Sequence, residues 1–192
     1  MKELTEIRWH GRGGQGAKTA ALLFADAALA QGLYVQAFPE YGPERMGAPV
    51  ASFDRISSKP IVLHSGVINP DIVIVLDPTL IDTVDVKEGI PDGGTIIINT
   101  EKSPADIKKE LGISGSIKIY TVDASTISKE TIGREIPNTP MLGALIKAAG
   151  ILDFNAMVED TKKKLEKKFK SKPEVIEGNI KAIERAYKEV KS

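Results

Sequence analysis

Two short runs of β-branched residues constrain the fold more than any other feature of the sequence. They are DIVIVLD at 71–77 and GTIIINT at 94–100, and no polar residue alternates with the apolar ones inside either run. This pattern is typical of strands that are covered on both faces, as in a parallel sheet between two layers of helices. Four further runs predict strands at 6–10, 33–38, 49–56 and 116–123.

Helical stretches separate and follow these runs. We expect helices near 15–31, 104–111, 124–132, 139–149, 153–169 and 173–190. Ser103 before Pro104 and Thr139 before Pro140 predict an N-cap ahead of a proline in the first helical turn, and Gly150 predicts a C-terminal stop. The expected fold class is α/β: a Rossmann-like, mostly parallel sheet with helices on both faces and additional C-terminal helices.

We expect residues 1–192 to form a single domain, with a C-terminal helical appendage at about 153–192, because neither repeats nor a flexible linker divide the chain. An apolar stripe on the last helix is expected to pack on the chain's own sheet or preceding helix, with a partner subunit as the alternative. It comprises Ile176, Ile180, Ile183, Tyr187 and Val190. The run 161–172 carries seven lysines. It is interpreted as a solvated helix face, with docking of an acidic partner or a polyphosphate left open.

The segment FPEYGPERMGAP at 38–49 departs from the standard dinucleotide-binding plan. Its prolines remove backbone donors and its glycines weaken helices, so we expect a structured loop in place of a crossover helix. A parallel pair normally requires a long crossover. The strand at 49–56 is therefore expected to run antiparallel to a neighbour, and one possibility is a hairpin with residues 60–64 through the turn at 57–59.

Composition excludes several classes of function. The 26 basic residues balance the 26 acidic ones, so nothing favours nucleic acid or a membrane surface. There is no cysteine, which excludes thiolate nucleophiles and cysteine-held zinc or iron–sulfur clusters on this chain. His10 and His64 are expected to be ordinary strand-end residues, and no metal site is predicted. No apolar run approaches the length needed to cross a bilayer, so a cytoplasmic protein is expected.

The glycine-rich run HGRGGQGAKT at 10–19 matches one phosphate-binding template better than another. In a Walker A loop, lysine directly follows the last glycine, whereas here Ala17 separates Gly16 from Lys18. One extra helical residue turns the lysine by about 100° away from the phosphates. In the dinucleotide template G-x-G-x-x-G, Gly11 permits the tight turn, Gly13 the approach of a phosphate, and Gly16 the contact of helix with strand.

The evidence for a nicotinamide cofactor is weaker than the evidence for an anion. The motif requires an acidic residue at the end of the second strand to hold the adenosine ribose. The only candidate is Glu40, which lies beyond the end of that strand and inside the proline-rich segment. A free helix N-terminus after the glycines still suits an anion. A tight turn that binds nothing remains a second interpretation.

Four segments together carry a family resemblance. They are WHGRGGQGAKTAALLFADAALAQG, FPEYGPERMGAPVASFDRI, PDIVIVLDPTL and IPNTPMLGAL, which span about residues 6–150. In order and spacing they resemble the gamma subunits of the 2-oxoacid:ferredoxin oxidoreductases, especially those of the pyruvate type. GRGGQG combined with YGPERMGAPV is far more specific than either motif alone.

The resemblance implies one subunit of an enzyme that decarboxylates pyruvate, passes electrons to ferredoxin and transfers the acetyl group to coenzyme A. The enzyme would use thiamine diphosphate, Mg²⁺ and [4Fe-4S] clusters, none of them bound by this chain alone. The chain has no cysteine and no thiamine-diphosphate G-D-G…N-N signature. We therefore expect it to lack catalytic residues, to be inactive in isolation, and to assemble with alpha, beta and delta-type subunits, meeting ferredoxin only indirectly.

The resemblance also implies a coenzyme A side of the site. The residues carried over to it are Gly11, Arg12, Gly13, Gly14, Gln15, Gly16, Glu44, Arg45, Asn138 and Thr139. Arginine suits phosphate because its fork binds two oxygens, although Arg45 could equally form a salt bridge with Glu44 or Glu40. Met46 stands where related subunits often carry a second arginine. Two other functions stay open: a free-standing NAD(P)-linked oxidoreductase, and a scaffold whose glycine turn is empty.

Overall fold

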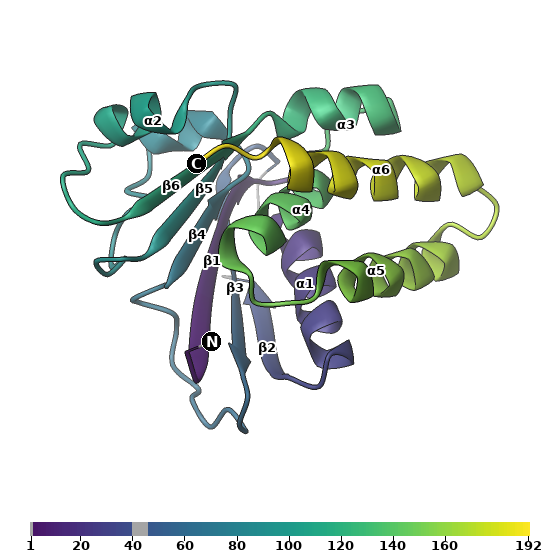
Figure 1. Cartoon of the computed structure of the whole chain (residues 1–192), viewed down its shortest axis with the longest axis horizontal. Coiled ribbons are helices and arrows are strands. Elements are labelled where there is room, and N and C mark those ends of the chain that lie inside the picture. The colour runs from purple at the N-terminus through teal and green to yellow at the C-terminus, as the bar shows by residue number, and fades with distance from the viewer. Residues whose placement is uncertain (1, 40–45) are drawn as a thin grey trace.

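The computed structural model describes residues 2–39 and 46–192. Its centre is a six-stranded sheet in the order β2-β3-β1-β4-β5-β6 (Figure 1). The strands are β1 (Leu4–Arg12), β2 (Tyr34–Pro39), β3 (Pro49–Ser57), β4 (Ile72–Val75), β5 (Thr95–Asn99) and β6 (Lys118–Val122). β1 pairs in parallel with β4, β4 with β5 and β5 with β6, whereas β3 is antiparallel to both β1 and β2. The prediction of a mostly parallel sheet is confirmed.

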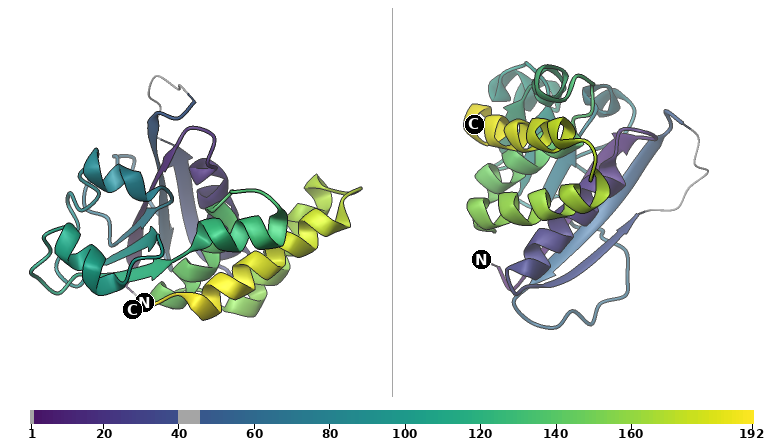
Figure 2. Two further views of the ribbon diagram at one scale, coloured as in Figure 1. Left: turned by 90° about the horizontal axis from the view of Figure 1, so that it is seen from above. Right: turned by 90° about the vertical axis from the view of Figure 1, so that its right-hand side faces the viewer.

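Helices cover both faces of the sheet, as predicted. The helices are α1 (Ala17–Ala30), η1 (Pro78–Asp82), α2 (Pro104–Glu110), α3 (Ala124–Ile132), α4 (Asn138–Ala149), α5 (Phe154–Lys168) and α6 (Pro173–Glu189). Figure 1 shows α1, α4, α5 and α6 on one side of the sheet and α2 on the other. In both views of Figure 2 the C-terminal helices lie on the α1 side.

The core consists of two apolar clusters, one on each face of the parallel strands. Ile74 and Ile97 join the α1 side, whereas Val73, Ile96 and Ile98 join the side of η1 and α2. Because successive side chains of a strand point to opposite faces, a strand buried on both sides is apolar on both faces along its centre, with polar residues confined to its ends. The uninterrupted runs in the sequence reflect this requirement.

β3 has the antiparallel direction that the sequence predicted, but the predicted hairpin is wrong. Residues 59–64 form no strand. Both edges of β3 are already paired, with β1 on one side and β2 on the other, so no edge is left for that segment. His64 lies in this stretch, exposed and outside any strand, which corrects its placement at a strand end.

The C-terminal helices pack on the rest of the chain. α6 contacts α4 and α3, and Ile176 and Ile183 of its apolar stripe are buried there. In α5, Leu165 is buried and Lys164 pairs with Asp26 and Asp160, while the remaining lysines of the run 161–172 are exposed. This packing supports a single domain over residues 1–192, which stays a prediction.

The N-cap predicted at Thr139 is wrong, whereas the cap at Ser103 and the stop at Gly150 are confirmed. α4 begins at Asn138, and its N-cap position is Pro137, whose φ of −71° is already helical. Because the proline ring fixes this angle, the helix starts two residues earlier than the Thr-Pro signal indicates. No helix among the described residues is both long and apolar enough to span a membrane.

Candidate functional site

The glycine run lies where the sheet reverses the direction of its connections. β1 leads to α1 on one face, while its parallel neighbour β4 leads to η1, which packs in the cluster on the other face. In open α/β sheets the crevice at such a point, outside the carboxyl ends of the strands, is the usual place for a ligand. Residues 13–16 follow β1 and residues 76–79 follow β4, so these two connections are neighbours at this edge of the sheet.

The glycines perform different roles from those predicted. Gly11 is still part of β1, and a Cβ there would meet Leu76 Cδ1 at 3.2 Å and Ala17 Cβ at 3.3 Å, so Gly11 permits the close packing of strand and helix. The sharp turn is made by Gly14 and Gly16, whose φ angles are 98° and 84°. These positive angles strongly favour glycine. The roles predicted for Gly11 and Gly16 are corrected accordingly.

Hydrogen bonds within the loop use several of the expected anion donors. The Gly13 amide donates to the Ala48 carbonyl at 2.9 Å, and the Gly47 amide donates to the Gly13 carbonyl at 3.1 Å. The Gln15 side chain folds back, so that its Oε1 accepts from the Arg12 amide at 2.7 Å. The loop is therefore held by its own Gln15 side chain and by Gly47 and Ala48 of the segment before β3, without a ligand.

The N-terminus of α1 remains open to an anion. Gly16 is its N-cap and supplies no side-chain acceptor. The first amide that donates back within the helix is that of Ala20, to the Gly16 carbonyl at 2.9 Å, so the amides of Ala17, Lys18 and Thr19 have no partner within the helix. These donors and the positive end of the helix dipole favour a negative group.

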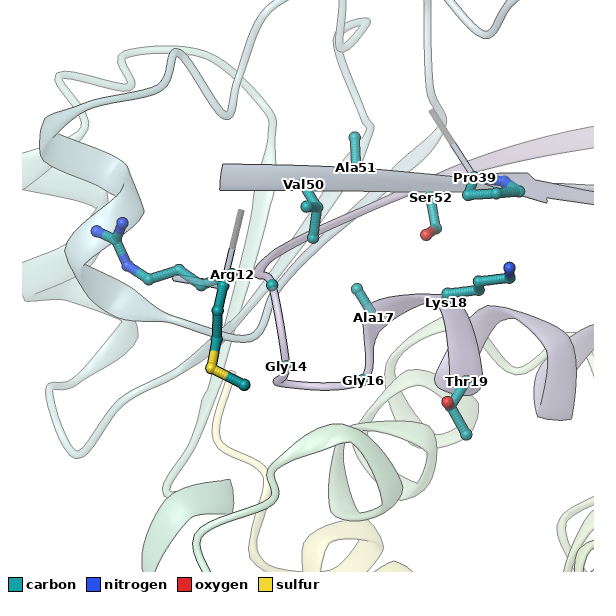
Figure 3. A pocket seen from close by; sticks show the side chains of 12 residues that line it. Arg12, Gly14, Gly16, Ala17, Lys18, Thr19, Pro39, Val50, Ala51 and Ser52 are labelled. Carbon is teal, nitrogen blue, oxygen red and sulfur yellow. The ribbon is translucent and has the colours of Figure 1, made fainter. Parts of the chain in front are cut away.

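A hollow of about 470 Å³ adjoins this helix end (Figure 3). Its lining includes Gly14, Gly16 and Lys18 from the loop and helix, and Val50 and Ser52 from β3. Figure 3 shows the Lys18 and Arg12 side chains extending to opposite sides of the hollow. Lys18 is exposed, so its ammonium group is accessible to an anion at this edge.

The Arg12 guanidinium is already engaged by protein groups. Its Nε donates to Asp77 Oδ2 at 3.2 Å, its Nη2 to Thr79 Oγ1 at 2.8 Å, and its Nη1 to the Gly47 carbonyl at 3.2 Å. Partial burial by itself raises the pKa of Asp77. Hydrogen bonds from Thr79 and Gln15 and the charge of Arg12 outweigh it and lower the pKa below its ordinary 3.8. Asp77 is thus ionised at neutral pH and neutralises Arg12.

Asn138 and Thr139 occupy two different environments. Asn138 lies against the turn, because a Cβ on Gly16 would come within 2.5 Å of Asn138 Nδ2. Thr139 is buried at 4% exposure, and its hydroxyl lies 2.8 Å from Asn179 Oδ1 of α6. The structure brings Asn138 to the glycine turn and places Thr139 in the packing of α4 against α6.

Two predicted site residues, Glu44 and Arg45, lie outside the described residues, so the interpretations given for Arg45 stay predictions. Met46 borders the hollow and is 94% exposed. His10 is buried in β1, where desolvation and the charge of Arg8 lower its pKa from 6.5 to about 4. Within residues 2–39 and 46–192, no group of three metal-binding side chains lies together.

Sequence reasoning did not consider Asp77 or Thr79, and it set Lys18 aside as a misplaced Walker A lysine. The signal for Asp77 was present, because Asp-Pro after a strand has the same form as Ser103-Pro104, and Asp77 does cap η1 through the Thr79 amide at 3.0 Å. What the sequence could not show is that the same carboxylate reaches across to the glycine loop.

A sequence model of one family, pyruvate ferredoxin/flavodoxin oxidoreductase, matches residues 6–189. The chain belongs to this family. The pyruvate synthase subunit PorC of Thermotoga maritima is 48% identical over 190 residues, covering 99% of this chain and 96% of PorC. The pyruvate/ketoisovalerate oxidoreductases common subunit gamma of Thermococcus litoralis is 50% identical over 159 residues, covering 83% of this chain and 85% of that subunit.

A solved structure supports the same relationship. The crystal structure of pyruvate oxidoreductase subunit PORC from Thermotoga maritima matches with a TM-score of 0.84 and 46% identity, covering 99% of this chain and 98% of that one. The resemblance found in the sequence is confirmed, and so is its implication that the chain is one subunit of a larger oxidoreductase. The comparisons do not support the alternative of a free-standing NAD(P)-linked enzyme.

Proposed function

We propose that this chain is the gamma subunit of a cytoplasmic pyruvate:ferredoxin oxidoreductase, and that its glycine turn holds the phosphate groups of coenzyme A in the assembled enzyme. It assembles with alpha, beta and delta-type subunits, and those subunits pass electrons to ferredoxin. The relatives named as pyruvate synthase or pyruvate/ketoisovalerate oxidoreductase subunits support the choice of enzyme.

One observation carries the coenzyme A role: the uncapped N-terminus of α1 opens beside a hollow that also borders Lys18. Pyrophosphate is bound at such helix ends by amide donors and by the helix dipole. With Arg12 neutralised by Asp77, the proposed anion donors are the amides of residues 17–19 and the Lys18 ammonium group. This revises the predicted site, in which Arg12 itself was to contact phosphate.

The reactive centres belong to other subunits in this proposal. The chain contains no cysteine, so it cannot supply thiolate ligands for an iron–sulfur cluster. Its sequence also lacks the thiamine-diphosphate signature described above. The isolated chain is accordingly expected to show no turnover of pyruvate, whereas the reconstituted complex does.

The test uses the reconstituted complex with Lys18→Gln. Loss of one charge-assisted contact to phosphate should raise the KM for coenzyme A on the order of tenfold. The KM for pyruvate and the turnover at saturating coenzyme A should be unchanged. Lys163→Gln provides the matched control, because Lys163 is also an exposed helical lysine but belongs to α5.

An unchanged KM for coenzyme A in the assembled Lys18→Gln complex would contradict the coenzyme A role and favour a scaffold with an empty turn. Calorimetric titration of the purified chain with NAD should show no binding heat. Turnover of pyruvate by the purified chain without companion subunits would overturn the proposal as a whole.

A further inference from the structure

We propose that Asp77 is a positioning residue that clamps the glycine loop in the shape required to bind coenzyme A. The inference rests on the proposed function. Asp77 lies on the β4–η1 connection and does not line the hollow beside α1. It acts through the loop it holds.

The carboxylate of Asp77 divides its two oxygens between two segments. Oδ2 accepts from Gln15 Nε2 at 2.7 Å and from Arg12 Nε at 3.2 Å, both in the glycine loop. Oδ1 accepts from the Thr79 amide at 3.0 Å and lies 2.7 Å from the Thr79 hydroxyl, both at the start of η1. One side chain thus joins the ends of the two neighbouring parallel strands, β1 and β4.

Thr79 and Gln15 extend the clamp in both directions. The Thr79 hydroxyl donates to Asp77 and accepts from Arg12 Nη2 at 2.8 Å, which closes a ring of three side chains. The Gln15 amide donates to Asp77 and accepts from the Arg12 backbone amide, so both of its ends are used. Hydrogen bonds to a charged group are stronger than neutral ones.

The hydrogen bonds of Asp77 restrict a turn that is built from Gly14 and Gly16. Glycine has the largest conformational freedom of any residue, so a loop of glycines loses the most entropy when a ligand orders it. A loop held in its bound shape beforehand avoids that loss. Asp77 supplies this order and leaves the amides at the start of α1 free for the ligand.

The test compares three variants in the reconstituted complex. Asp77→Asn keeps the size of the side chain, but it removes the charge and sets an amide donor where one of the accepting oxygens was. It should raise the KM for coenzyme A on the order of tenfold. The turnover at saturating coenzyme A and the KM for pyruvate should be unchanged. Amide hydrogen exchange over residues 11–19 should accelerate in the same variant.

Thr79→Val supplies a second variant that is safe for folding, because Thr79 is exposed. It removes only the hydroxyl of the ring and should raise the KM for coenzyme A by about threefold, since a neutral hydrogen bond contributes less than a charged one. Asp153→Asn is the matched control. It makes the same chemical change at the N-cap of α5, where Asp153 accepts from the Ala156 amide at 2.8 Å, and it should change neither measurement.

The outcomes separate the clamp from the proposed function. If Lys18→Gln raises the KM for coenzyme A but Asp77→Asn alters neither that KM nor the exchange of residues 11–19, the clamp is refuted and the coenzyme A role stands. If Asp77→Asn accelerates exchange but neither variant changes the KM, the loop is clamped for another reason, and both proposals are overturned.

Discussion

The two halves of the sheet are built on different principles. The parallel half, from β4 to β6, is apolar at its buried positions except Thr95, Asn99 and Thr121, and lies between helices on both faces. The antiparallel half, β2 and β3, buries polar side chains: Ser52, Asp54, Arg55 and Ser57 of β3 are all less than 4% exposed. Residues 58–70 form no helix or strand, and the carbonyls of Leu63 and Gly66 in this segment accept hydrogen bonds from Gln36 and Arg55.

The polar side chains of the antiparallel half depend on specific partners. Arg55 donates to Glu6 Oε1 at 2.7 Å, to Gln36 Oε1 at 3.2 Å and to the Gly66 carbonyl at 3.0 Å. Asp54 accepts from Trp9 Nε1 at 2.7 Å, but its other oxygen has no hydrogen-bond partner within residues 2–39 and 46–192. We therefore expect the parallel half to stabilise the fold through apolar burial. The antiparallel half should make the free energy of unfolding depend on the ionisation of its buried polar side chains.

The largest effect is expected from a cavity in the parallel half. Ile97→Ala removes a fully buried side chain at the centre of β5. It should lower the free energy of unfolding by about 4 kcal/mol, through lost apolar burial and the cavity left behind. Chemical denaturation of the purified chain measures this change. A loss below about 1 kcal/mol would show that apolar burial does not dominate this half.

A pH-dependent effect is expected from Asp54 in the antiparallel half. Burial raises the pKa of Asp54 well above its ordinary 3.8, and the hydrogen bond from Trp9 only partly opposes this. The folded chain therefore keeps a proton that the unfolded chain releases above about pH 3.9. Rising pH consequently favours unfolding for as long as Asp54 stays protonated in the folded chain.

Asp54→Asn tests this dependence, because asparagine cannot ionise. As the pH rises from 4, the free energy of unfolding of the wild type should fall relative to that of the variant. The difference should grow by about 1.4 kcal/mol for each pH unit while Asp54 keeps its proton. Denaturation at a series of pH values measures the difference. Parallel curves for the two proteins between pH 4 and 7 would mean that Asp54 is ionised in the folded state.

The smallest effect is expected at an exposed apolar side chain of residues 58–70, the segment between β3 and β4. Ile68 is 73% exposed, in contrast to Ile97, which is fully buried. Ile68→Ser should therefore change the free energy of unfolding by less than about 0.5 kcal/mol. The same denaturation experiment provides the check. A loss comparable to that of Ile97→Ala would show that the Ile68 side chain is packed in the folded core.

Most of the helices and strands could be predicted because their signals are local. Ser103-Pro104 and Gly150 marked the ends of helices, and the period of the apolar residues marked strands. One error arose where distant strands decided the outcome: residues 60–64 looked like a strand, but β3 is already paired on both edges. The other arose locally: Thr139 looked like a cap, but Pro137 takes the N-cap position and α4 begins at Asn138.

The candidate site was predicted in part. The glycine run and its position before α1 follow from a motif whose geometry recurs between proteins. The nearness of Asn138 was implied by the family resemblance. Whether the charge of Arg12 is available to a ligand could not be predicted from a motif, because this depends on whether another protein group neutralises it. Asp77 lies 65 positions from Arg12 along the chain, and only the parallel pairing of β1 with β4 brings them together.

The sequence by itself determined the fold class, the family and the glycine turn, because the apolar period, the absence of cysteine and the order of the motifs are properties of the chain alone. Only the tertiary structure decided which glycines make the turn, which strands border β3 and that Asp77 neutralises Arg12. These depend on contacts between residues far apart in the chain, where competition for hydrogen-bond partners selects one arrangement among several that the local sequence allows.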